Sequence, residues 1–141
     1  MAAKQRLGLR QVRALKPGEI ITEVIVPAPS AGVRSHYLEA REKQSFDWPL
    51  VSVAIALDFA PGAKTVRDAR VVMGAVAPVP WRSPEAEAAL KGGPLDESRA
   101  RAAAGAALKD AQPMSDNAYK VVIAKVIVRR AIMSAAGLEA A

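Results

Sequence analysis

The sequence predicts an α+β fold in which a four-stranded antiparallel sheet is followed by three helices packed on one face. Segments rich in β-branched residues fill the first half of the chain and are separated by short turns. Segments with helical periodicity fill the second half. Runs of strands followed by runs of helices favour two packed layers. With 141 residues, the chain suits one domain with its own hydrophobic core.

Two strands are expected before the centre of the chain. The first is Ile20 to Val26, which follows the turn signal Lys16-Pro17-Gly18-Glu19 and ends at Pro27. The second is Arg34 to Glu42, in which Tyr37 is the large residue.

The third and fourth strands alternate strongly. In Leu50 to Phe59, bulky residues at every second position alternate with Ser52, Ala54, Ala56 and Asp58. The small side allows close packing, so we expect the helices to cover that side. The fourth strand, Val66 to Ala77, follows a Pro-Gly turn.

Three helices are expected next, and each follows a residue that can cap it. They are Glu85 to Leu90, a second helix that ends near Asp110, and Asn117 to about Ala136. The capping residues are in turn Ser83, Asp96, and either Ser115 or Asp116. The second helix is rich in alanine, which gives it high propensity and a slim profile.

Composition excludes several classes of site. The chain has no cysteine, which rules out disulfides and thiolate or iron–sulfur ligation by its own residues. One histidine, His36, cannot form a histidine-rich metal centre, so no metal site is expected. No apolar run reaches the roughly 18 residues of a membrane span. A cytoplasmic location is expected, or a periplasmic one for an assembled complex.

The net charge of +6 has its densest part at the start of the chain. We interpret residues 1–16 as a basic leader, disordered or foreign to the domain, and residues 17–138 as the domain. A small nucleic-acid- or anion-binding module is the alternative function, but such a module needs a helical or aromatic reading surface. The leader offers none.

No complete catalytic set is present, so no catalytic residue is expected. The sequence lacks a glycine-rich phosphate-binding loop and a nucleophile elbow. His36 has no carboxylate beside it in sequence, and is better interpreted as a surface or interface histidine. Glu39 and Glu42 fall on opposite faces of a regular strand and do not form an acid–base pair.

Two clusters combine aromatic and charged residues. The loop from Arg41 to Pro49 contains two of the six aromatic residues and leads into a strand, where binding groups commonly lie. It can equally be a surface turn whose Phe46 and Trp48 close the edge of the core. The other cluster, Pro80-Trp81-Arg82, is expected to plug the junction between sheet and helices with Trp81.

Five motifs in order resemble one family. They are Gly18–Val24 (GEIITEV), Ser35–Leu38 (SHYL), Asp47–Ala54 (DWPLVSVA), Gly74–Arg82 (GAVAPVPWR) and Asp116–Lys120 (DNAYK). Together they resemble the C-terminal domain of the FAD-binding subunit of molybdenum hydroxylases, the group of xanthine, carbon monoxide and aldehyde oxidoreductases. The last two motifs are most similar to the aldehyde oxidoreductase branch. The resemblance covers about Pro17 to Met133.

The resemblance implies a sheet with three helices that covers one side of a flavin and docks the partner subunits. Those partners are an iron–sulfur subunit and a molybdopterin subunit, and electrons pass from molybdopterin through the clusters to FAD. The N-terminal FAD domain of the family is absent from this sequence. We therefore expect a part of the subunit that does not retain FAD alone. A folded domain with a pure assembly role overlaps with this interpretation.

The resemblance also implies the site residues, all in the second strand and the loop after it. Relatives often have a lysine near the flavin where this sequence has Glu39. The flavin-side surface is therefore assigned to Glu39, Arg41, Asp47 and Trp48. An exposed apolar patch is expected near Trp48.

Overall fold

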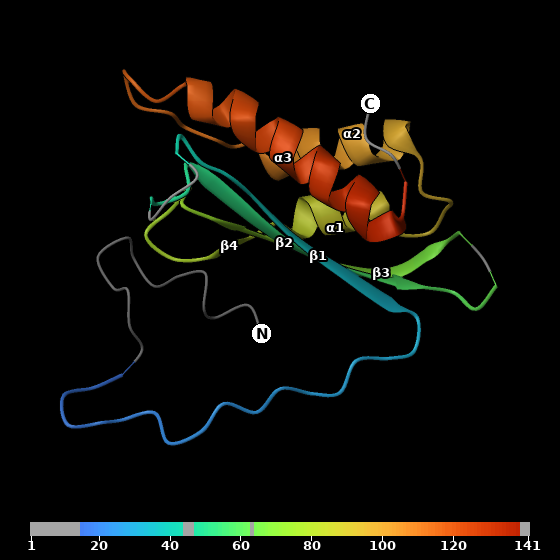
Figure 1. The fold of residues 1–141 in the computed structure, drawn as a ribbon, viewed down its shortest axis with the longest axis horizontal. Helices are drawn as coiled ribbons and strands as arrows, with labels where there is room; N and C mark the ends of the chain where they lie inside the picture. The colour runs from blue at the N-terminus through green and yellow to red at the C-terminus, as the bar shows by residue number, and fades with distance from the viewer. Residues whose placement is uncertain (1–14, 44–46, 63, 139–141) are drawn as a thin grey trace.

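A four-stranded antiparallel sheet and three helices form two layers (Figure 1). The computed structural model describes residues 15–43, 47–62 and 64–138. The strands follow the chain order across the sheet: β1 (Val33–Ala40), β2 (Val51–Phe59), β3 (Val66–Gly74) and β4 (Trp81–Arg82). The helices are α1 (Pro84–Leu90), α2 (Glu97–Ala107) and α3 (Tyr119–Ala136). The predicted fold class is confirmed, with a different choice of one strand.

The segment Ile20–Val26 was predicted to be a strand, and this prediction is wrong for the chain by itself. The segment is extended but pairs with no other strand among the described residues. The fourth strand is instead β4, which pairs Arg82 with Val72 and Trp81 with Met73. A strand requires a neighbour for its backbone groups as well as β-branched residues. The described part of the chain supplies no such neighbour here.

Two of the three predicted caps are confirmed. Ser83 Oγ accepts a hydrogen bond from the Ala86 amide at 3.2 Å, and Asp96 Oδ1 accepts one from the Arg99 amide at 2.8 Å. Neither Ser115 nor Asp116 caps α3, which starts after Ala118 without a side-chain cap. The nearby Asn117 side chain accepts a hydrogen bond from the Met114 amide and closes a turn instead. α2 also ends earlier than predicted, at Ala107.

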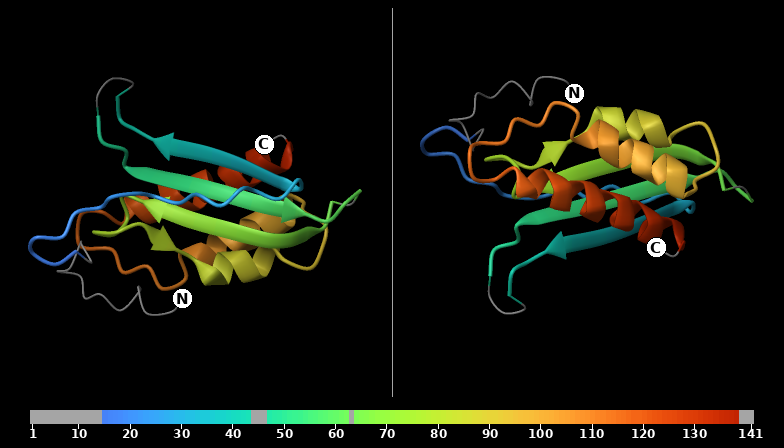
Figure 2. Two further views of the ribbon diagram at one scale, coloured as in Figure 1. Left: turned by 90° about the horizontal axis from the view of Figure 1, so that it is seen from below. Right: turned by 90° about the horizontal axis from the view of Figure 1, so that it is seen from above.

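The helices cover the bulky face of the sheet, not the small face that was expected. The bulky residues Val51, Val53, Ile55 and Leu57 of β2 are at most 2% exposed. Views from both sides show the three helices on one face only (Figure 2). Burial of large apolar side chains provides the main driving force for folding. That gain outweighs the closer approach that the small face would allow.

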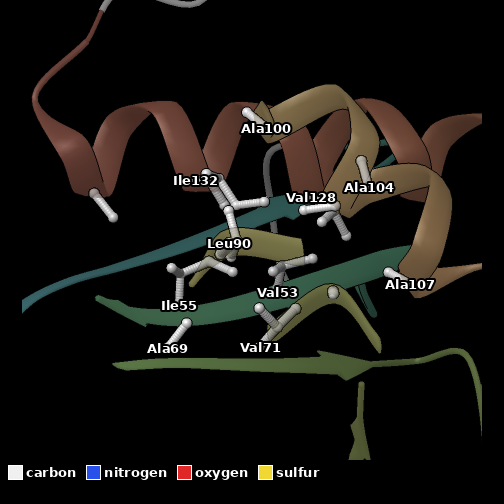
Figure 3. Close-up of a cluster of buried hydrophobic side chains, with 14 of the residues drawn as sticks. Val53, Ile55, Ala69, Val71, Leu90, Ala100, Ala104, Ala107, Val128 and Ile132 are labelled. Carbon is white, nitrogen blue, oxygen red and sulfur yellow. The ribbon is translucent and has the colours of Figure 1, made fainter. Parts of the chain in front are cut away.

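Small residues on the helices keep the layers close together. The buried residues of α2 are all alanines, namely Ala100, Ala103, Ala104 and Ala107. They face larger residues of α1, α3 and the sheet, including Leu90, Val128 and Ile132 (Figure 3). The alternation of slim and bulky surfaces lets three helices share one sheet face.

Candidate functional site

The candidate site lies where β1 ends and the chain turns towards β2. The Leu50 amide donates a hydrogen bond to the Ala40 carbonyl at 2.8 Å, which closes the loop of residues 41–49. Residues 44–46, including Phe46, lie outside the described residues. The strand register therefore fixes the two ends of this loop beside each other, and its described side chains project from the end of the sheet.

Glu39 and Arg41 are brought together, as members of one predicted site should be. The two side chains form an ion pair between Arg41 Nη2 and Glu39 Oε1. The second carboxylate oxygen of Glu39 accepts a hydrogen bond from the Tyr37 hydroxyl at 3.0 Å. Sequence reasoning gave Tyr37 no role in the site. Its spacing of two from Glu39 was the available signal, since residues i and i+2 share a strand face.

Asp47 and Trp48 lie in the same loop but make no hydrogen bond or ion pair with Glu39 or Arg41 among the described residues. The Trp48 side chain is 90% exposed. Tryptophan is usually well buried, so this exposed indole is the largest apolar surface that the described part of the loop offers to a partner. The exposure is the one expected for this residue, and it excludes the interpretation in which Trp48 closes the core edge.

The uncovered face of the sheet leads up to this loop. Glu39 pairs across the sheet with Ser52, and Ser52 with Gly74. A Cβ atom at Gly74 would meet the Ser52 hydroxyl oxygen, so a side chain there would displace this hydroxyl. Ala54 lies next along β2 and is exposed. The result is a shallow face of small side chains next to Glu39.

The second aromatic cluster does not plug the core. Trp81 was expected to wedge between sheet and helices, but it is 43% exposed on the short edge strand β4. The junction is filled instead by Ser83 and by Glu87, which is 3% exposed. Glu87 accepts hydrogen bonds from the Val71 amide and twice from Arg82. Sequence reasoning missed this buried carboxylate, although the pair Arg82 and Glu87 is visible as opposite charges flanking a cap.

Two hollows lie elsewhere among the described residues. One of about 140 Å³ at the α2–α3 connection is smaller than the 300–1,000 Å³ usual for a ligand pocket. The other, of about 630 Å³ between α2 and α3, is within that range, and Glu97 in it pairs with Arg101 and Arg129. No group of three His, Asp or Glu side chains suited to a metal ion occurs in the part of the chain that the structure describes. Within the same residues, no helix is long and apolar enough to cross a membrane.

Comparison with known families decides what this domain is. The model of the CO dehydrogenase flavoprotein C-terminal domain matches residues 35–135. The chain belongs to this family. Most of the two-layer fold lies within the matched residues, and the predicted resemblance to the C-terminal domain of molybdenum hydroxylase FAD subunits is confirmed.

Individual relatives of this flavoprotein C-terminal domain agree. The aldehyde oxidoreductase FAD-binding subunit PaoB of Escherichia coli is 35% identical over 112 residues, which are 79% of this chain and 31% of that protein. A carbon monoxide dehydrogenase of Hydrogenophaga pseudoflava superposes with a TM-score of 0.70 at 32% identity, covering 78% of this chain and 39% of that one.

Quinoline 2-oxidoreductase of Pseudomonas putida superposes with a TM-score of 0.71 at 28% identity, covering 79% of this chain and 39% of its own. The flavoprotein C-terminal domain described here therefore spans about a third of the length of the curated relative and about two fifths of the solved chains.

Proposed function

We propose that this domain covers the flavin of a molybdenum hydroxylase and docks the partner subunits during electron transfer from iron–sulfur clusters to FAD. The observation that carries the proposal is the exposed Trp48 in the loop that follows the Glu39–Arg41 pair, in a domain of the flavoprotein family. The partners are the flavin-binding part of the subunit, an iron–sulfur subunit and a molybdopterin subunit.

The side chains of the loop fit a flavin. FAD supplies the redox chemistry of such a subunit when it is bound, through a planar aromatic ring system. An exposed indole offers a flat apolar surface for such a ring, since aromatic pairs stack favourably. The Trp48 side chain needs no rearrangement of the core to make that contact, because it is 90% exposed.

The charges of Glu39 and Arg41 are also compatible with a bound flavin. A carboxylate alone at position 39 would repel an electron-rich ring, but Glu39 is bound to the Arg41 guanidinium. The pair carries no net charge, and the Tyr37 hydroxyl donates a hydrogen bond to the other carboxylate oxygen of Glu39. We infer that Arg41 removes the repulsion by neutralising Glu39, and that Tyr37 positions the carboxylate.

A chimera tests the proposal. In it, the region of the E. coli FAD-binding subunit that matches this chain is replaced by the matching part of this chain. The chimera should keep FAD and accept electrons from its iron–sulfur partner. Trp48→Ala should increase quenching of flavin fluorescence by iodide, whereas Trp81→Ala, at a partly exposed tryptophan on β4, should not. A chimera that binds FAD with equal iodide access for both variants contradicts a covering role.

The chain alone should not retain FAD. Its sequence has no glycine-rich segment that precedes a helix and cradles phosphates. Produced by itself, the protein should be colourless, and its visible absorption should stay below about one tenth of a flavin per chain. The chimera serves as the positive control. A yellow preparation with stoichiometric flavin would overturn this part of the proposal.

The alternative, a nucleic-acid- or anion-binding module, has less support. Several basic side chains of the described residues are tied to carboxylates, among them Arg67 to Asp58, Arg70 and Lys91 to Asp68, and Arg101 to Glu97. Counterion release requires cations free to meet phosphates. Binding to duplex DNA that falls steeply between 50 and 200 mM salt would restore this alternative.

A further inference from the structure

The segment before the sheet exposes an unusual amount of apolar surface. Five of its side chains are between 68% and 82% exposed, namely Ile20, Ile21, Val24, Ile25 and Val26. Soluble proteins rarely leave contiguous apolar surface in water unless it is a contact site. These residues therefore need a partner that the described residues do not supply.

The order of these residues indicates what kind of partner. In an extended chain, Ile20, Val24 and Val26 lie on one side, and Ile21 and Ile25 on the other. A strand that is apolar on both sides is typical of one covered on both faces in a sheet. A surface strand or a flexible linker would be polar on at least one side. Glu23 is the only charged residue between Ile20 and Val26.

The backbone of the segment is unpaired as well. Among the described residues, no backbone hydrogen bond involves residues 20–29. The flanking bonds, Glu19 to Lys16 and Val33 to Ser30, only shape the turns at either end. Pairing with a partner strand would satisfy these groups, and main-chain hydrogen bonds give such strand addition its affinity.

The position of the segment narrows the choice of partner. It runs on the side of the sheet opposite the helices (Figures 1 and 2). This is the side of the uncovered face that leads to Glu39. The related proteins are about two and a half to three times as long as the part this chain matches. More than half of each of these relatives therefore lies outside the matched region.

We propose that Ile20–Val26 completes a β-sheet of the flavin-binding part of the subunit by pairing with it as an added strand. The proposal rests on the proposed function, since it makes this segment the main link between the two parts. The apolar side chains on both sides of the strand would be buried in that domain. The uncovered sheet face would then lie against the same domain.

The test uses the full chain and the part of the E. coli FAD-binding subunit that this chain does not match, produced separately and confirmed to hold FAD. Binding is measured by isothermal titration, and the mass of the complex by light scattering. Glu23→Pro and Val24→Pro each remove one backbone donor, and neighbouring donors point to opposite edges of a strand. At least one of the two variants should weaken binding about 100-fold.

Matched variants separate backbone pairing from side-chain contact and from misfolding. Val24→Ile keeps the backbone donor, the branched shape and the apolar character, so it should stay within about 10-fold of the parent. Ala28→Pro lies in the link beyond the segment and should bind like the parent. None of these variants should change the thermal unfolding midpoint of the chain, because the segment lies outside the core.

Each outcome has a meaning. If the flavin-bearing part binds the two proline variants and the parent equally, the strand proposal is wrong. The same holds if the full chain does not bind that part while the chimera still keeps FAD and accepts electrons, since the proposed function then survives alone. A complex of two copies of this chain that the proline variants abolish would also overturn the proposal, because it assigns the strand to self-association.

Discussion

At the scale of single residues, the buried carboxylate of Glu87 joins three elements. It accepts a hydrogen bond from the Val71 amide of β3 at 3.1 Å, and two from Arg82 of β4 at 2.7 Å, while it belongs to α1. A buried charge is tolerated only when its hydrogen bonds are satisfied. Glu87 therefore fixes how the short edge strand and the first helix meet the sheet.

Replacement of Glu87 should test this junction. Glu87→Ala leaves the Val71 amide without its acceptor and removes the carboxylate that Arg82 binds. We expect a loss of about 2–3 kcal/mol in the free energy of unfolding, measured by urea denaturation. Glu85→Ala removes an exposed carboxylate two residues before Glu87, and it should cost about 0.5 kcal/mol. Equal effects of the two substitutions would contradict the role of Glu87.

A second carboxylate gives the domain a pH dependence. A hydrogen bond from Lys91, together with the charge of Arg70, lowers the pKa of Asp68 below its ordinary value. The unfolded chain therefore binds a proton at Asp68 at a higher pH than the folded chain does. Stability from this group is complete above the unfolded pKa and is lost as pH falls through the folded one.

Asp68→Asn should therefore flatten the stability profile at low pH. At pH 7 the variant should lose less than about 1 kcal/mol, since Asp68 is partly exposed and such pairs are weak. The difference from the parent should begin to shrink as pH falls below about 4 and should disappear only below the lower pKa of the folded state, where the parent carboxyl is protonated too. Thermal unfolding between pH 2 and 7 measures both. A difference that persists at pH 2 would assign the effect to lost packing.

At the scale of elements, the sequence predicted the strands and helices whose pattern lies within their own residues. The strands β2 and β3 follow from alternation, and α1 and α2 begin where Ser83 and Asp96 predicted. β4 was missed because two residues carry no pattern, and their pairing depends on β3. Ile20–Val26 has the composition of a strand, but a strand also needs a neighbour, which lies elsewhere.

The candidate site rests on the family resemblance and on the loop position, and the assignment of Glu39, Arg41, Asp47 and Trp48 to a flavin-side surface stays a prediction. Glu39 and Arg41, two positions apart, form an ion pair. The uncovered small face could not be predicted, because alternation alone defines two faces without assigning either to the core. The Tyr37 hydrogen bond follows from a spacing of two along one strand face, a signal that the sequence contained and that was not used.

Two capping candidates, Asp96 and Asp116, test whether a capping residue in the sequence is enough to place the start of a helix. Asp96 accepts a hydrogen bond from the Arg99 amide at the start of α2, so Asp96→Ala should cost about 1 kcal/mol in urea denaturation. Asp116 was an equally good capping candidate by sequence, but its carboxylate contacts only Ser115. Asp116→Ala should therefore change stability by less than about 0.5 kcal/mol. The reverse order would mean that α3 starts earlier in solution.

At the scale of the whole molecule, the chain has a folded part and a segment that awaits a partner. The two-layer core is confined to residues from Leu38 onward, and the first contacts that anchor the chain to it come from Ser30 and Gly32. Residues before them are exposed wherever they are described. Such a division is typical of a domain that folds by itself and uses an extended arm for assembly.

Removal of residues 1–28 should therefore leave the folded part intact. The shortened chain retains every contact of the described core, so its free energy of unfolding should stay within about 0.5 kcal/mol of the parent. Arg34→Ala is the matched disruption, because Arg34 stacks on Phe59 and donates a hydrogen bond to the last carbonyl of α3. It should cost about 1–2 kcal/mol. In the binding experiment the shortened chain should fail to join the flavin-bearing part, although it is as stable as the parent. A shortened chain that unfolds readily would instead mean that the arm belongs to this domain's own core, and the partner strand would then be unnecessary.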